Sequence, residues 1–259
     1  MTETTTLLPG LFIRRIENPS EVELDRLVQI KVACDPDIQP NFIAAATGYG
    51  TPLQKDIWTG VLRAACTAGY LFAACFEDPL NIIGQVTFFP PGKSILGDEE
   101  QLAMGFTDAL GRMPEEKRNK LSHGDLPGYA ALVEAVLGPD EKHESWSVNM
   151  LAVSAEYRRK GVARALLQAG EQLATKDSKG SVVLEALGLN VETYTRMGYG
   201  MIGQKDMYSG DDSFMWFRVG PPYLREMNAA ELAISRHLAP QSNNSGYFHV
   251  FTINFVVDV

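Results

Sequence analysis

Cysteine and histidine are scarce in this chain of 259 residues, which contains three cysteines and four histidines. Cys34, Cys66 and Cys75 are odd in number and irregularly spaced, so we expect reduced thiols and a cytoplasmic location instead of a disulfide framework. The histidines do not stand in the spacing of a metal site, so we expect no bound metal.

Long apolar runs and excess positive charge are also missing. No stretch approaches the ~20 apolar residues of a membrane-spanning helix, and the first residues lack a signal-peptide pattern, so we expect neither membrane association nor secretion. The net charge of -9 disfavours nucleic acid as a partner, because phosphates would be repelled. The acidic surface suits a cationic amine acceptor, although solubility alone explains the charge equally well.

The most informative segment that is present combines a strand, a turn and a helix. Residues 146–153 are apolar on one face and partly apolar on the other, which predicts a strand. The turn reads Arg-Arg-Lys-Gly-Val-Ala over residues 158–163. A single apolar stripe then predicts an amphipathic helix, and it consists of Val162, Ala165, Leu166, Ala169 and Leu173.

This arrangement suits the binding of a pyrophosphate. A helix N-terminus offers unpaired N–H groups to an anion, and a small residue such as Gly161 lets the backbone approach it. We therefore predict that the N–H groups of residues 159–163 bind phosphate. The cations that would neutralise it are Arg158, Arg159, Lys160 and Arg164. The motif alone is weakly specific, and the alternative is an ordinary surface turn at the start of a helix.

The segments that follow make the motif more specific. Residues 181–186 read as a strand and residues 190–197 as a short helix, with Tyr194 four residues before Gly198-Tyr199. Together with Leu151-Ala152-Val153 and the turn at 158–163, this order resembles the GNAT superfamily of acyl-CoA-dependent N-acyltransferases. Two positions depart from the family pattern. Leu187 stands where many relatives have Asn, and Ser147 stands where the histone-modifying branch has Glu.

The resemblance implies a fold and a set of site residues. The fold is of the α/β (α+β) class, with a mixed, mainly antiparallel central sheet flanked by helices. Acetyl-CoA would be the cosubstrate, with its pyrophosphate held by Arg158, Arg159, Lys160, Gly161, Val162, Ala163 and Arg164, and its pantetheine arm by the backbone of Leu151 and Val153.

The resemblance also assigns catalytic roles. Tyr194 would be the general acid that protonates the leaving thiolate; the alternative is a tyrosine that only packs its ring on the sheet. For the general base we name Glu144, which precedes the strand at 146–153, with Glu185 and His143 as alternatives.

The rest of the chain divides into further elements. We expect a GNAT-like domain over residues 1–220, in which 93–143 form a helical insertion that covers the acceptor site, and a C-terminal extension over 221–259. That extension would contain a helix and an apolar strand, and the strand would pair within its own sheet or with a second copy in a homodimer. Other expected strands cover 11–16, 70–76, 81–89, 201–207 and 213–219, and other expected helices cover 22–32, 52–68, 99–110, 114–121 and 127–137.

Three functions compete at this stage. The first is an N-acetyltransferase that moves the acetyl group of acetyl-CoA directly to a small-molecule or peptide amine. The second is a non-catalytic CoA-binding module with a regulatory or assembly role. The third, a dinucleotide-dependent oxidoreductase, is disfavoured because no Gly-x-Gly-x-x-Gly follows the first strand.

Overall fold

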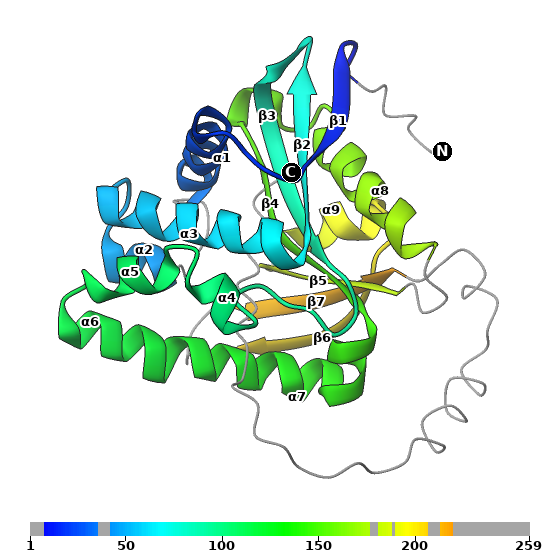
Figure 1. The fold of residues 1–259 in the computed structure, drawn as a ribbon. Coiled ribbons are helices and arrows are strands. Elements are labelled where there is room, and N and C mark those ends of the chain that lie inside the picture. The colour runs from blue at the N-terminus through cyan, green and yellow to red at the C-terminus, as the bar shows by residue number, and fades with distance from the viewer. Residues whose placement is uncertain (1–7, 36–41, 177–180, 188–189, 207–212, 220–259) are drawn as a thin grey trace, which may run out of the picture.

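A computed structural model describes the backbone of residues 8–35, 42–176, 181–187, 190–206 and 213–219. The predicted C-terminal helix and strand lie outside these residues. The described residues form one seven-stranded sheet in the order β1-β2-β3-β4-β5-β7-β6, with helices on both faces (Figure 1). The strands are β1 (Leu11–Ile16), β2 (Tyr70–Phe76), β3 (Asp78–Phe89), β4 (Trp146–Val153), β5 (Val182–Leu187), β6 (Gly200–Asp206) and β7 (Ser213–Val219).

Neighbouring strands run antiparallel throughout, except that β4 and β5 run parallel. The predicted fold class is therefore confirmed. A parallel pair needs a crossover connection, and here α8 (Val162–Ala174) provides it between β4 and β5. The Arg-Arg-Lys-Gly turn consequently lies at the C-terminal end of β4, where the chain enters this crossover.

The helices divide between the two faces of the sheet. α8 and α9 (Val191–Arg196) cover one face, which we call the α8 face. The helices from α1 to α7 cover the other, which we call the α3 face. Those helices are α1 (Glu21–Cys34), α2 (Phe42–Thr47), α3 (Pro52–Ala68), α4 (Glu99–Leu102), α5 (Phe106–Gly111), α6 (Glu115–Lys120) and α7 (Leu126–Glu144).

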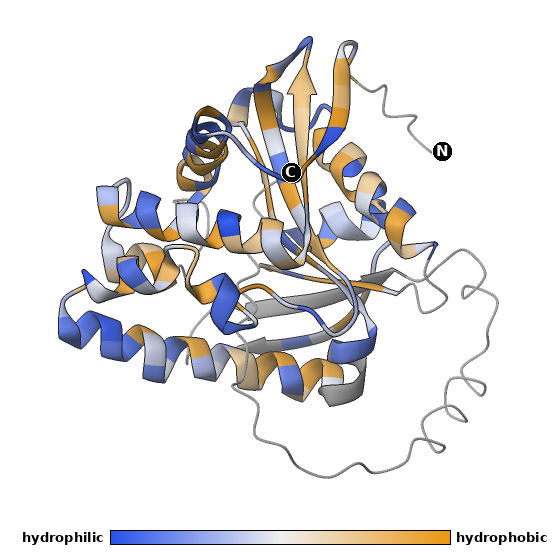
Figure 2. Ribbon diagram, viewed as in Figure 1, coloured by the Kyte–Doolittle hydropathy of each residue, from blue (hydrophilic) through white to orange (hydrophobic). Residues whose placement is uncertain are grey.

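The 93–143 segment is helical, as predicted, but more divided. The single helix expected over 99–110 is two short helices, α4 and α5, because Gly105 adopts a φ of 108° between them. α6 has no buried residue, and Figure 2 shows it as mostly hydrophilic. α2 was not predicted, and its Phe42 and Ile43 are buried in the core of the α3 face.

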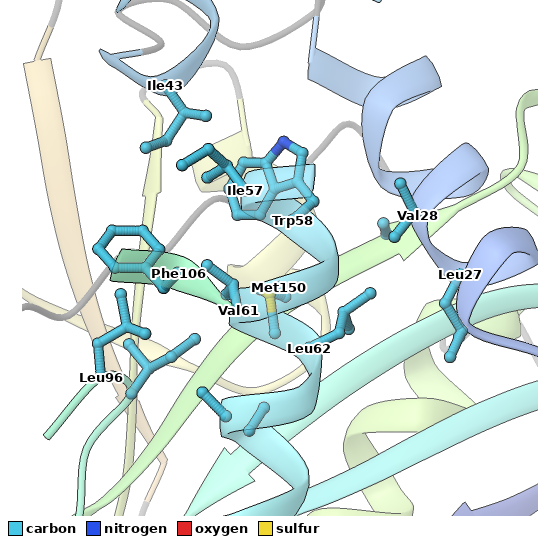
Figure 3. Packing of buried hydrophobic residues seen from close by; sticks show 14 of the residues in the cluster. Leu27, Val28, Ile43, Ile57, Trp58, Val61, Leu62, Leu96, Phe106 and Met150 are labelled. Atoms are coloured by element: carbon cyan, nitrogen blue, oxygen red, sulfur yellow. The ribbon is translucent and has the colours of Figure 1, made fainter. Parts of the chain in front are cut away.

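A buried polar network joins α1 to α3 beneath this apolar core. The carboxylate of Asp35 accepts hydrogen bonds from Lys31, from Gln54 Nε2 at 2.6 Å and from Trp58 Nε1 at 2.8 Å. The Lys31 ammonium also lies 4.1 Å from the centroid of the Trp58 ring. All four side chains have no exposed surface. Figure 3 shows Trp58 among the apolar side chains of α3, above Met150 of β4. The network therefore holds α1 and α3 together over the middle of the sheet.

We predict that Lys31→Met lowers the free energy of unfolding by about 3–5 kcal/mol, because it leaves the Asp35 charge buried without its cation. Urea denaturation followed by circular dichroism measures this change. The double variant Lys31→Met/Asp35→Asn removes both charges but keeps an oxygen to accept from Gln54 and Trp58, so it should recover most of the loss. A single variant as stable as the wild type would show that this ion pair does not hold the two helices.

Candidate active site

The turn after β4 has the geometry of an anion site. α8 begins after Gly161, which adopts a φ of 80°, and no side-chain hydrogen bond from the described residues caps the helix there. Arg159 also has a positive φ, 57°, which non-glycine residues rarely adopt. These two conformations turn the chain sharply into a helix of 13 residues. The first N–H groups of α8 are thus left for a ligand, and the helix dipole favours an anion.

The four cations of the motif do different things. The side chains of Arg159 and Lys160 are exposed, and Lys160 Nζ lies 5.4 Å from the ring centroid of Tyr157. Arg158 instead turns back, donating from Nε to the Val153 carbonyl at 3.2 Å. Arg164 donates to the carbonyl of Arg196 at 3.1 Å, which ties α8 to the end of α9. Arg158 and Arg164 therefore stabilise the framework of the turn.

The Arg158 guanidinium also contacts α1. One of its amino groups lies 3.5 Å from the sulfur of Cys34, which itself lies 3.7 Å from the Val153 carbonyl oxygen. Burial raises the pKa of the Cys34 thiol, so the thiol stays protonated at neutral pH. Arg26 of α1 donates to the Ile82 carbonyl at 2.8 Å. α1 is thereby fixed to the ends of β3 and β4, directly beneath the turn.

β4 contains a bulge in the middle of the sheet. Gln85 pairs with Ala152 and Thr87 with Asn149, so two residues of β4 lie opposite one residue of β3. Met150, inside the bulge, has a φ of 51°. A bulge bends its strand and increases the local twist.

β4 and β5 separate beside this bulge. Their described pairing consists of two residue pairs, Trp146 with Val182 and Ser147 with Val183. Both strands continue for several residues beyond these pairs, but the described chain shows no further registered pair between them. Backbone groups of β4 that face β5, around Leu151 and Val153, are consequently not used in the sheet. No residue pattern in the sequence indicates this separation; the family resemblance implied only that the backbone of Leu151 and Val153 would bind the pantetheine arm.

Tyr194 lies on α9 at the α8 face of this separation. Its side chain is completely buried, in one apolar cluster with Leu151 and Val153 of β4 and with Val162 and Ala163 of α8. Burial raises the pKa of the Tyr194 phenol well above its ordinary value, so the hydroxyl carries its proton at neutral pH. The structure thus brings Tyr194 together with the predicted residues of β4 and of the turn.

Tyr199 supports Tyr194 from the side. The two rings meet edge to face with centroids 5.9 Å apart, and Tyr199 Oη donates to Glu171 of α8 at 2.6 Å. Burial first, and then the Glu171 carboxylate, raise the pKa of Tyr199 well above its ordinary value. The Gly-Tyr pair at 198–199 therefore fixes the ring of the tyrosine four residues earlier.

The structure does not bring the first candidate base to this place. Glu144 and His143 are exposed at the end of α7, where β4 begins, and the bulge lies several residues further along the strand. Glu185, by contrast, is completely buried on β5 and accepts a hydrogen bond from the hydroxyl of Tyr129 in α7. Of the three candidates, Glu185 lies beside the separated strands.

Two buried polar residues were missed by the sequence reasoning. Gln85 of β3 and Asn149 of β4 have no exposed surface. Neither the carboxamide oxygen and nitrogen of Gln85 nor the side-chain oxygen of Asn149 has a hydrogen-bond partner among the described residues. The signal was present, since a glutamine interrupts the apolar run of residues 82–89.

Other kinds of site find no support in the described part of the chain. No group of three or more His, Cys, Asp or Glu side chains there could hold a metal ion. None of the described helices is long and apolar enough to cross a membrane. A shallow depression lies between α8 and the strands β1 and β2, lined among others by Ile13, Phe72 and Gln168, and no residue of the candidate active site lines it.

Comparisons with known proteins agree with this geometry. Residues 124–210 match the acetyltransferase (GNAT) domain family. Polyamine N-acetyltransferase from Drosophila melanogaster has a similar fold, with 15% identity and a TM-score of 0.52 over 82% of this chain and 100% of that one. An agmatine N-acetyltransferase gives 14% identity and a TM-score of 0.52, over 82% of this chain and 100% of that one. A GNAT acetyltransferase from Elizabethkingia anophelis, solved with acetyl-CoA bound, gives 10% identity and a TM-score of 0.43, over 83% and 100%.

No match is found among curated proteins. The matched segment begins at residue 124, just before α7, and includes α7, the bulged strand β4, the Gly161 turn, α8, β5 and α9. These are the elements from which the candidate active site is built. The resemblance read from the sequence is thus confirmed by the match of residues 124–210 to the acetyltransferase (GNAT) domain family.

Proposed function

We propose that this protein is an acetyl-CoA-dependent N-acetyltransferase that moves the acetyl group to a primary amine by direct attack. The observation that carries the proposal is the separation of β4 from β5 next to an uncapped helix start at Gly161. Together they offer an open strand edge for the pantetheine arm and N–H groups for the pyrophosphate. The GNAT domain match supports the same activity.

The donor would be held by backbone more than by side chains. N–H groups of residues 159–163 bind the pyrophosphate, and the exposed cations of Arg159 and Lys160 add charge. Arg158 and Arg164 contribute by fixing the turn, because their guanidinium groups already bind the carbonyls of Val153 and Arg196. The β4 groups around Leu151 and Val153 pair with the pantetheine arm. An N–H near Leu151 stabilises the oxyanion of the tetrahedral intermediate.

Tyr194 would then complete the transfer. The amine nitrogen attacks the thioester carbonyl, the C–S bond breaks, and the Tyr194 hydroxyl gives its proton to the departing thiolate. Burial raises the pKa of the Tyr194 phenol, so the hydroxyl carries its proton when the thiolate forms. No cysteine of the described site lies next to Tyr194, so attack proceeds without a covalent enzyme intermediate.

The acceptor would be a small cationic amine. Two proteins of similar fold are named for agmatine and polyamines, and the net charge of -9 favours cations at the surface. The 93–143 segment would contribute to the choice of amine, since Tyr129 within it contacts Glu185. We also keep as proposals the cytoplasmic location, the domain boundary near residue 220 and a homodimer through the C-terminal strand.

We predict that Gly161→Glu weakens acetyl-CoA binding at least tenfold, measured by isothermal titration calorimetry at near-physiological salt. A carboxylate at this position repels the pyrophosphate and neutralises the positive end of the helix dipole that would attract it. Unchanged affinity in this variant would remove the turn from the donor site.

Gly161→Ala is the matched control for this variant, because it strains the positive φ without adding charge. It should lower the free energy of unfolding by about 1 kcal/mol while changing the affinity for acetyl-CoA much less. Gly111→Ala, at a position with open space and no positive φ, should leave both quantities nearly unchanged.

We predict that Tyr194→Phe lowers kcat by about 10²–10⁴-fold and leaves the Kd for acetyl-CoA nearly unchanged. Release of the CoA thiol with agmatine, spermidine and simple alkylamines measures the rate. If the wild type binds acetyl-CoA but acetylates none of these amines, the non-catalytic CoA-binding module becomes the better description. Equal turnover in the two proteins would exclude Tyr194 as the acid.

A further inference from the structure

Four buried polar side chains stand together on the α3 face of the sheet. Val86 and Phe88 face α8, so Gln85 and Thr87, which alternate with them along β3, point to the opposite face. The same alternation places Asn149 on the α3 face, since Val148 faces α8. It also places Glu185 there, where Tyr129 reaches it.

The strand register brings these side chains into one row. Thr87 lies opposite Asn149, and counting two residues on from the pair Ser147–Val183 puts Glu185 level with Asn149 across the separation of β4 from β5. Gln85 is the next side chain along β3 on this face. Its neighbours on the flanking strands are Ala73 and Ala152, whose short side chains leave the carboxamide uncrowded.

Two members of this row, Gln85 and Asn149, have buried side-chain atoms without a hydrogen-bond partner among the described residues, and this calls for an explanation. Gln85 and Asn149 are completely buried, yet the described chain offers nothing to the Gln85 carboxamide or to the Asn149 oxygen. Burying a polar group without a hydrogen bond destabilises a protein, and native proteins tolerate it mainly at functional positions. Apolar residues would fill both positions at lower cost, so we look for a ligand that supplies the missing donors.

We propose that Gln85, Asn149 and Glu185 bind the acceptor's amino group as an ammonium ion, and that Glu185 then takes its proton. This inference rests on the proposed function. An alkylammonium has three N–H donors, which match the two carboxamide oxygens and the carboxylate. In the molecule without substrates, Tyr129 donates to Glu185 from α7 and takes the place of one of those donors.

The position of the row relative to Tyr194 suits the reaction. Tyr194 approaches the separation of β4 and β5 from the α8 face, and Glu185 from the α3 face. A thioester lying between the strands would have the acid on one side and the amine on the other. Glu185, directly or through one water, takes one proton from R–NH3+, and that proton leaves to solvent.

The freed lone pair then forms the C–N bond as the C–S bond breaks. Tyr194 gives its proton to the thiolate, and the second proton lost by nitrogen restores the phenol through solvent. The products are the amide, CoA thiol and one released proton, so atoms and charge balance. Both buried groups return to their starting states.

The first test uses Gln85→Met and Asn149→Leu, which keep the volume but remove the carboxamides. If the row is an ammonium site, each variant raises the KM for spermidine or agmatine by about 10–100-fold, leaves the KM for acetyl-CoA unchanged, and raises the Tm. Higher stability with weaker acceptor binding separates a ligand site from a structural role. Gln101→Met is the control, because that equally buried glutamine donates to Asp98 in α4, and it should lower Tm without changing either KM.

The second test uses Glu185→Gln, which can still accept a hydrogen bond from Tyr129. With an alkylamine, kcat should fall at least about 10²-fold, because the ammonium keeps its proton. With methoxyamine, which is neutral at pH 7, the same variant should lose much less, because no proton needs to be removed before attack. Equal losses with both acceptors would show that Glu185 is not the base.

The outcomes separate this inference from the function on which it rests. If the wild type acetylates no amine of the panel, the proposed function fails and the ammonium site fails with it. If the wild type is active and Gln85→Met and Asn149→Leu keep its acceptor KM, only the ammonium site is wrong.

Discussion

The parting of two parallel strands at the centre of the sheet is the constraint on which the rest of the site depends. A sheet normally satisfies every backbone group between neighbours, yet β4 and β5 share two residue pairs and then diverge beside the bulge at Met150. The unused edge of β4 would give the proposed donor a place, and the parallel crossover brings the start of α8 to the end of that edge. Glu185 lies on β5, the strand that follows this crossover, and Tyr194 lies on α9, the helix that follows β5.

The two faces of the sheet differ in polarity where β4 and β5 separate. The α8 face is apolar around Tyr194, which keeps the phenol protonated and dry. The α3 face places Gln85, Asn149 and Glu185 in an otherwise apolar core. The larger core on that side, with the buried ion pair of Lys31 and Asp35, gives these residues a rigid background. The proposed acetyl transfer would therefore take place between an apolar environment around Tyr194 and a polar one around Glu185.

Much of this arrangement could be predicted from sequence because it follows from local patterns. The strand at 146–153, the Gly161 turn and the stripe of α8 are local features, and the structure reproduces them. The bulge could not be foreseen, because it depends on how β3 pairs with β4. α2 is only six residues long and too short for a periodic signal. The sequence could not decide among Glu144, Glu185 and His143 for the same reason, since burial and contact with Tyr129 depend on tertiary packing.

Arg158 illustrates a further limit of motif reading, since a cation in a phosphate motif binds the carbonyl of Val153 instead of facing outward.

The separation of β4 from β5 has a wider consequence. It divides the sheet into a block of β1 to β4 and a block of β5 to β7, and among the described residues these blocks share two registered residue pairs. A pantetheine arm lying along β4 would act as an inserted eighth strand that joins the blocks. Cosubstrate occupancy and the mechanical integrity of the domain would then be thermodynamically linked, so cellular acetyl-CoA levels would influence how long the protein survives.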